Sequence, residues 1–187
     1  MFVLLSQALL DCGVLAAFSA LLASPVAFLR KRACQAINYI AGGSEAQIQA
    51  LIDAQVIPPL LAMMREEKVR SVHFHVTWAI CNVACGSEQQ IRYLAQQDVI
   101  PSLCAQFVCA NTLNGALDAV KSILRVGAAD TNKRNDGSST VYAEQVEQCG
   151  GLDSLLALRS KADISADCRR KAGEILDSHW KAMGRGK

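Results

Sequence analysis

A repeat of about 42 residues is the feature that most constrains how this chain folds. The segment QALLDCGVLAAFSALL (7–22) aligns with QALIDAQVIPPLLAMM (49–64), where Gln, Ala, Leu, Asp, Val and Ala recur at a constant shift of 42. AQVIPPLL (54–61) recurs as QDVIPSLC (97–104) at a shift of 43. A single copy of this length does not bury its own apolar face, so successive copies stack and share a continuous core. The sequence therefore predicts an array of stacked units.

A fourth copy completes the array. CGGLDSLLAL (149–158) echoes CGVLAAFSALL (12–22), after an extra segment near 130–140 that is rich in Asn, Asp, Gly and Ser. That composition favours an exposed loop. We predict a single domain over 1–187 with approximate repeats at 1–42, 43–85, 86–127 and 128–187.

Three helices are predicted within the clearest copy, 43–85. Ser44 and Gln47 form a capping-box pattern, which starts a short helix over about 44–54. Pro58 and Pro59 suit the opening of a second helix, where a missing N–H group costs nothing. A third helix follows the charged turn REEK, because apolar residues then recur at intervals of three and four. These residues are Val72, Val76, Ala79, Ile80 and Val83.

Composition agrees with a helical array. The chain is 51% hydrophobic and 19% charged, which is typical of a folded protein with a sizeable core. It has only 4 Pro and 5% aromatic residues, which favours helices over strands. Three-helix units of this length are typical of the armadillo/HEAT class, whose repeats run to roughly 40 to 47 residues. We therefore predict an all-α fold, a right-handed armadillo-repeat superhelix of about four units.

Enzyme and metal chemistry find little support in the sequence. It contains no Gly-rich phosphate loop, nucleophile elbow or paired-acid motif. His73 and His75 lie two residues apart, so on a helix they point to different faces and do not chelate one metal ion. The eight cysteines lack zinc-like spacing and are expected to be reduced and mostly buried. We predict no catalytic residue, no metal ligand and no cofactor.

Membrane and nucleic-acid binding are also disfavoured. The uncharged run at 12–29 contains Ser19, Ser24 and Pro25, which argues against a membrane span. A net charge of +2 gives little support for nucleic-acid binding. A helical array that grips DNA is a third, weaker alternative. It would need a basic concave stripe, for which the candidate residues are Arg30, Lys31, Arg32, Lys121, Arg169, Arg170 and Lys171.

Four segments resemble one family. They are LRKRACQAINYIAGGSEAQIQALIDAQVIPPLLAMM (29–64), TWAICNVACGSEQQIRYLAQQDVIPSLC (77–104), ALDAVKSILRVG (116–127) and EQCGGLDSLLAL (147–158). In order and in spacing they resemble the C-terminal armadillo repeats of importin-α, the adaptor that carries nuclear-localisation signals. The resemblance covers nearly the whole chain.

The resemblance implies a role for one Trp and one Asn. In importin-α the third helix of each unit lines a concave groove, where Trp-x-x-x-Asn pairs hold an extended basic peptide. Trp78 and Asn82 match that pair. The indole would form a slot for the stem of a Lys or Arg side chain, with cation–π attraction to its head. The carboxamide would hydrogen-bond to the peptide backbone.

Other positions of the groove depart from the family. The Trp and Asn positions hold Gln35 and Tyr39 one unit earlier, and Asp118 and Ser122 one unit later. The family often places an acid three residues before a groove Trp, where this chain has His75, and Arg32 one unit earlier. The resemblance thus implies a weakened form of the family's minor cargo site. Asp118 either restores some acidity there or is simply solvated.

The resemblance also implies partners. It begins inside the family's array, so the N-terminal importin-β-binding segment and the major cargo site are expected to be absent, in a fragment or a shortened paralogue. Basic cargo peptides are the expected partners, with the export receptor and nuclear-pore-associated proteins at the last repeats. The expected location is cytoplasm and nucleus. The alternative is a generic armadillo scaffold for protein–protein interaction that is indifferent to basic cargo.

Overall fold

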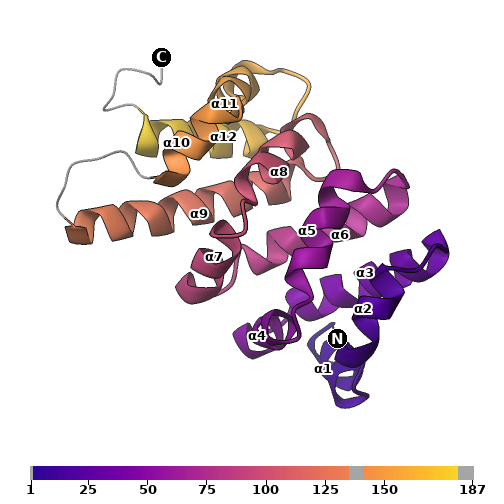
Figure 1. Ribbon diagram of the computed structural model, residues 1–187. Coiled ribbons are helices and arrows are strands. Elements are labelled where there is room, and N and C mark those ends of the chain that lie inside the picture. Colours follow the sequence, from indigo (N-terminus) through magenta and orange to yellow (C-terminus); the bar gives the residue numbers. More distant parts are fainter. Residues whose placement is uncertain (1, 135–140, 181–187) are drawn as a thin grey trace. The chain divides into compact units, whose positions relative to one another are not determined.

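The computed structural model describes residues 2–134 and 141–180, and all regular secondary structure in this part of the chain is helical (Figure 1). The helices group into two compact units, Met1–Gln97 and Asp98–Lys187, which we call unit 1 and unit 2 and describe separately. The predicted single array therefore consists of two compact units. None of the described helices is both long and apolar enough to span a bilayer.

Unit 1 contains the first two three-helix copies and the first helix of the third. Its helices are α1 (Phe2–Asp11), α2 (Leu15–Leu22), α3 (Ala27–Ala41), α4 (Glu45–Asp53), α5 (Ile57–Glu66), α6 (Arg70–Val83) and α7 (Glu88–Ala95). The three helices predicted for the clearest copy are α4, α5 and α6. Pro58 and Pro59 lie in the first turn of α5, as expected.

Unit 2 contains the remainder of the third copy and the fourth. Its helices are α8 (Ile100–Cys104), the 3₁₀ helix η1 (Ala105–Val108), α9 (Leu113–Arg134), α10 (Val141–Gln148), α11 (Gly151–Ser160) and α12 (Ala166–His179). Because α9 extends to Arg134, the start of the segment predicted as a loop near 130–140 is helical. Asn and Asp favour turns, but polar residues also extend a helix that is already nucleated. Residues 135–140 lie outside the described residues.

The same backbone turn recurs in every copy. Gly13, Gln55, Asp98 and Gly150 have positive φ angles between 54° and 75°, and each lies between the first and second helix of its copy. Glycine adopts this left-handed conformation without steric cost, whereas Gln55 and Asp98 are held in it by their surroundings. The spacing of these turns follows the repeat found in the sequence.

Two capping boxes tie neighbouring copies together. The predicted pairs Ser44–Gln47 and Ser87–Gln90 each form both hydrogen bonds of the motif. Both glutamines are only 3% exposed, and each reaches back one copy. Gln90 Nε2 donates to the Glu45 carbonyl at 2.8 Å, and Gln47 Nε2 donates to Gln7 Oε1 at 3.1 Å. The residues that start these helices therefore also fix the stacking of consecutive copies.

The core of unit 1 lies between the two third helices, α3 and α6, which pack side by side. Ile37 and Ile40 on α3 and Val76 and Ile80 on α6 are fully buried. Each such side chain stabilises the fold by about 1.5–3 kcal/mol relative to an exposed one. Adjacent third helices are thus held firmly against each other.

In unit 2, α12 packs on α9 and α11. Ile175, Leu176 and Trp180 are fully buried there, and Trp180 Nε1 donates to Glu147 Oε1 at 2.6 Å. All eight cysteines lie in the described part, and no disulfide joins them. Four of them are buried: Cys34, Cys81, Cys104 and Cys168.

Candidate functional site

The third helices of unit 1 present the candidate site. We call the face that carries Arg32, Gln35, Tyr39, His75, Trp78 and Asn82 the α3–α6 face. Neither α3 nor α6 contains an Asp or Glu residue. The two helices carry four cationic residues, namely Arg30, Lys31, Arg32 and Arg70.

Asn82 is fixed to the preceding repeat. Its Nδ2 donates to Asn38 Oδ1 at 3.0 Å and to the Asn38 carbonyl at 3.3 Å. These two bonds use the donor end of the carboxamide. The Asn82 Oδ1 atom has no hydrogen-bond partner among the described residues. The geometry therefore leaves an acceptor that suits a backbone N–H group.

Trp78 lies in an aromatic cluster on α6. Its ring meets the ring of Phe74 edge to face, with 6.3 Å between centroids, and Phe74 meets His75 in the same way at 5.3 Å. Trp78 is half-buried, so part of the indole is accessible. Aromatic pairs of this kind contribute about 0.5–1.5 kcal/mol beyond burial, which holds the indole in place.

His75 occupies the position where an acid was expected for a cargo site. Burial lowers the pKa of its imidazole below the usual range, and the positive charges of Lys31 and Arg32 lower this pKa further. The imidazole is thus biased toward its neutral form. A neutral ring beside two cations does not replace the missing carboxylate.

Gln35 and Tyr39 are bound to each other. Gln35 Nε2 donates to Tyr39 Oη at 3.0 Å, and Arg32 Nη1 donates to Gln35 Oε1 at 3.0 Å. The Arg32 guanidinium also lies 5.0 Å from the centroid of the exposed Phe28 ring. The first copy thus presents an ordered polar row instead of a Trp–Asn pair.

In unit 2 the candidate acid, Asp118, forms an ion pair with a lysine. Lys171 Nζ on α12 lies 2.7 Å from Asp118 Oδ2 on α9, and it also donates to Asn114 Oδ1 at 2.7 Å. Asp118 is therefore paired with a cation, although its side chain remains 40% exposed. Ser122 lies one turn further along α9 and is half-buried.

One further ion pair joins the same two helices, and two more lie within α12. Lys121 Nζ lies 2.6 Å from Glu174 Oε2, and Arg170 binds both Asp167 and Glu174. The charged side chains in these pairs are thus neutralised by one another. A peptide would have to break these pairs to use them.

The proposed basic stripe is reduced by the same arrangement. Arg30 Nε lies 2.7 Å from Glu67 Oε2, and Arg169 Nη1 donates to three backbone carbonyls within unit 2. Of the seven cationic residues considered for a DNA-gripping array, Lys31, Arg32 and Arg169 have no acidic partner among the described residues. The other four are paired with Asp or Glu side chains, so most of the proposed stripe is neutralised.

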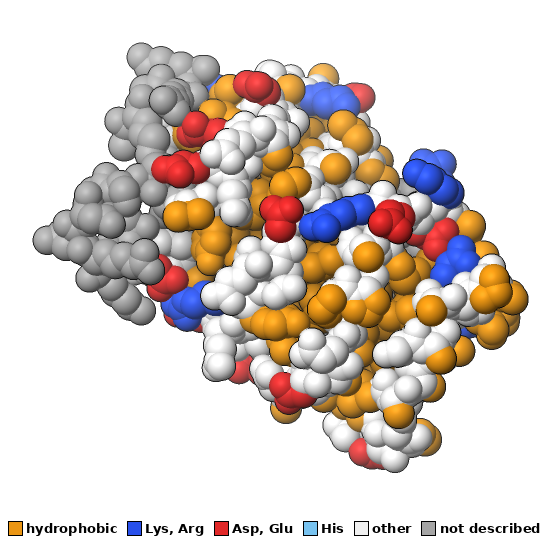
Figure 2. Space-filling model, viewed as in Figure 1, with side chains coloured by type: hydrophobic (Ala, Val, Ile, Leu, Met, Phe, Trp, Pro, Cys, Tyr) orange, Lys and Arg blue, Asp and Glu red, His pale blue; other side chains and the backbone are white. Residues whose placement is uncertain are grey.

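On the face drawn in Figure 2, the described Lys/Arg and Asp/Glu side chains are interspersed with hydrophobic and uncharged ones.

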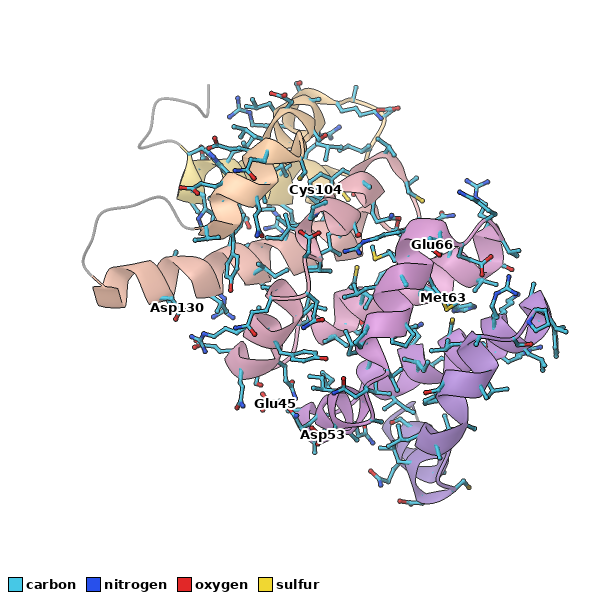
Figure 3. All side chains as sticks on the ribbon, in the orientation of Figure 1. Glu45, Asp53, Met63, Glu66, Cys104 and Asp130 are labelled. Carbon is cyan, nitrogen blue, oxygen red and sulfur yellow. The ribbon has the colours of Figure 1, made fainter. Side chains whose placement is uncertain are left out.

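Unit 1 also has a hollow of about 420 Å³ between the end of α5 and the start of α6. Met63 and Glu66, which line it, are labelled in Figure 3. Its Arg30 and Glu67 side chains bind each other, so we assign no ligand to this hollow.

Sequence reasoning missed several residues that shape these sites. Asn38 accepts a hydrogen bond from Asn82, the Phe74 ring contacts the Trp78 ring, and Lys171 forms an ion pair with Asp118. Phe74 lies four residues before Trp78, so helical spacing was a usable signal for it. Asn38 and Lys171 act over 44 and 53 residues, respectively, and only the fold reveals such pairs.

Four copies of three helices, repeated capping boxes and paired third helices define an armadillo-repeat protein, a class of α-solenoid. The family model for the Armadillo/beta-catenin-like repeat matches residues 44–85. A designed armadillo repeat protein is similar in structure, with a TM-score of 0.76 and 22% identity over 97% of this chain and 74% of its own. Another, solved in complex with the peptide (KR)4, has a TM-score of 0.62 and 24% identity, over 93% and 85% of the two chains.

The repeats are of a particular kind. The chain is 30% identical to importin subunit alpha-4 of Arabidopsis thaliana over 154 residues, which are 81% of this chain and 28% of that protein. It is 36% identical to importin subunit alpha-6 of the same plant over 66 residues, 35% of this chain and 12% of that protein. The chain is built from importin-α-like armadillo repeats. It spans less than a third of the length of these relatives.

Proposed function

We propose that this chain is the peptide-binding part of a nuclear-import adaptor, and that its α3–α6 face holds an extended peptide bearing a nuclear-localisation signal. The observation that carries the proposal is the pairing of an accessible Trp78 ring with an anchored Asn82 one helical turn away. The indole stacks on the stem of a Lys or Arg side chain, and Asn82 Oδ1 accepts a backbone N–H of the peptide. The relation to importin-α subunits supports this assignment.

Binding at this site is expected to be weak. No carboxylate on α3 or α6 meets the cationic head of the peptide side chain. Charge-assisted hydrogen bonds contribute roughly 1.5–3 kcal/mol each, and here the head group would have only the ring and water. Asp118 in unit 2 offers little help, because Lys171 already neutralises it.

The relation to importin-α supports further parts of the proposal. Under it, the chain works in the cytoplasm and nucleus without catalysis, and the last repeats in unit 2 meet the export receptor or nuclear-pore-associated proteins.

A second candidate is a generic armadillo scaffold that holds a peptide of another kind. The lack of acids on the α3–α6 face, together with Lys31 and Arg32, favours this alternative. The two candidates differ in the charge of the preferred peptide.

Titration of a fluorescent bipartite-type basic peptide tests the proposal. We expect binding that weakens as salt rises, because charged contacts are screened. Trp78→Ala should abolish it, and Trp78→Phe, which keeps an aromatic face, should retain part of it. Circular dichroism verifies that each variant is folded. Equal affinity of wild type and Trp78→Ala would refute the Trp slot, and preference for a neutral or acidic peptide would favour the scaffold.

A further inference from the structure

Two neighbouring cations on α3, Arg32 on the α3–α6 face and Lys31 next to it in sequence, lack an acidic partner among the described residues. Arg32 is exposed, Lys31 is half-buried, and neither forms an ion pair within the described part of the chain. Three other cations in third helices are paired with acids: Arg30 with Glu67, Lys121 with Glu174 and Lys171 with Asp118. Arg32 and Lys31 therefore carry positive charge that no described acid compensates, on the helix that packs against α6.

Arg32 is also held in position. Its Nη1 donates to Gln35 Oε1 at 3.0 Å, and its guanidinium lies over the ring of Phe28 at 5.0 Å. A guanidinium has five N–H donors, so this arrangement leaves donors available to a ligand. An ordered side chain loses less entropy when it binds a carboxylate.

We propose that the peptide bound at Trp78 carries an acidic residue, whose carboxylate binds Arg32 and Lys31. This inference rests on the proposed function and names the class of peptide. Its preferred partner is thus a localisation-signal peptide that also carries an acidic residue near the Lys or Arg held by Trp78. A second cation of the peptide at this place would face Arg32 and Lys31 and be repelled.

The spacing of the two peptide residues follows from the geometry of the helices. Packed helices lie about 8–10 Å apart, so Arg32 on α3 is roughly one helix spacing from the Trp78 slot on α6. An extended chain rises about 3.3 Å per residue. The acidic residue is therefore about three positions from the residue that stacks on Trp78.

The test uses synthetic fluorescent peptides with a Gly/Ser background. One carries Lys and Glu three positions apart, a second has Gln in place of Glu, a third has Gln in place of Lys, and a fourth reverses the order of Lys and Glu. Each is titrated into the full chain, into Lys31→Gln/Arg32→Gln, and into Trp78→Ala. Arg125→Gln is the matched control, because it removes an exposed cation from α9 in unit 2. Thermal unfolding verifies that all variants are folded.

We expect Glu in one of the two orders to improve the affinity for wild type by about two- to five-fold at low salt. The advantage should vanish in Lys31→Gln/Arg32→Gln and persist in Arg125→Gln. The inference is overturned if Glu and Gln peptides bind wild type equally, or if the advantage survives in the double variant. Failure of the proposed function would give another result. Trp78→Ala would then bind every peptide with the affinity of wild type, and both proteins would still bind the Glu peptide more tightly than the Gln peptide. Absence of binding by all peptides would overturn both.

Discussion

Asn82 on α6 donates its side-chain amide to the side chain of Asn38 on α3, with 3.0 Å between Nδ2 and Oδ1. The residue that matches the peptide-binding Asn of the family is thus oriented by the preceding repeat. Its donor end is committed to Asn38, and its oxygen is turned to accept. The stacking of two repeats therefore determines which end of the carboxamide a peptide meets.

Replacing Asn38 is expected to affect Asn82 without touching the peptide. Asn38→Ala and Asn82→Ala should each lower the free energy of unfolding by about 0.5–1.5 kcal/mol, because each removes the hydrogen bond between the two side chains, and Asn82→Ala also removes the bond to the Asn38 carbonyl. The double variant should lose less stability than the sum of the two single losses, since both residues take part in the same interaction. Denaturant unfolding of wild type, the two single variants and the double variant measures the coupling free energy between the two residues. Additive losses would show that the pair does not contribute as a unit.

Gly86 is expected to tolerate no side chain. A Cβ atom there would lie 2.4 Å from Gln90 Oε1 and 3.2 Å from Ile48 Cδ1. Because Gln90 is nearly buried and completes the capping box of α7, it has little room to move. We expect Gly86→Ala to destabilise the fold by about 1–3 kcal/mol, as overpacking does.

Gly173 provides the matched control for that substitution. It lies inside α12, where a Cβ would meet only Arg159 Cδ at 3.9 Å. Gly173→Ala should raise the free energy of unfolding by up to about 1 kcal/mol, because alanine favours a helix interior. Thermal unfolding of both variants measures the contrast. A Gly86→Ala protein as stable as wild type would show that Gln90 moves aside freely.

Part of this architecture was predictable from the sequence, for a physical reason. Helix caps such as Ser87 with Gln90 depend on residues three apart, and local spacing is visible in the chain. The repeat of 42–43 residues also placed His75 one copy after Arg32. The ion pair between Lys171 and Asp118 was not predictable, because it joins residues 53 apart whose neighbours offered other charges.

The pair of Arg30 and Glu67 should make stability depend on acid pH. The Arg30 guanidinium holds the pKa of the Glu67 carboxyl below its ordinary value of 4.5. The unfolded chain then binds a proton more readily than the folded one as pH falls. The contribution of the pair is therefore present above pH 4.5 and is lost as pH falls through the lowered pKa.

The change Glu67→Gln tests that dependence. At neutral pH the variant should unfold at a lower temperature than wild type, because Arg30 loses its charged partner. Below pH 4.5 the two unfolding temperatures should converge, since the wild-type carboxyl is then becoming protonated. Scanning calorimetry between pH 7 and pH 3 provides the measurement. A difference that stays constant over this range would contradict the ion-pair explanation.

Releasing Asp118 should create a site for cations in unit 2. Lys171→Gln removes the ammonium group 2.7 Å from Asp118 Oδ2, so the carboxylate is left to bind a Lys or Arg of a basic peptide. We expect the affinity for such a peptide to rise by up to about five-fold at low salt. Lys121→Gln is the matched control, because it removes one cation from the same helix pair while Arg170 still neutralises Glu174. Titration of a basic peptide into both variants is the measurement. An equal rise in affinity in both would mean that net charge alone, and not Asp118, sets the affinity.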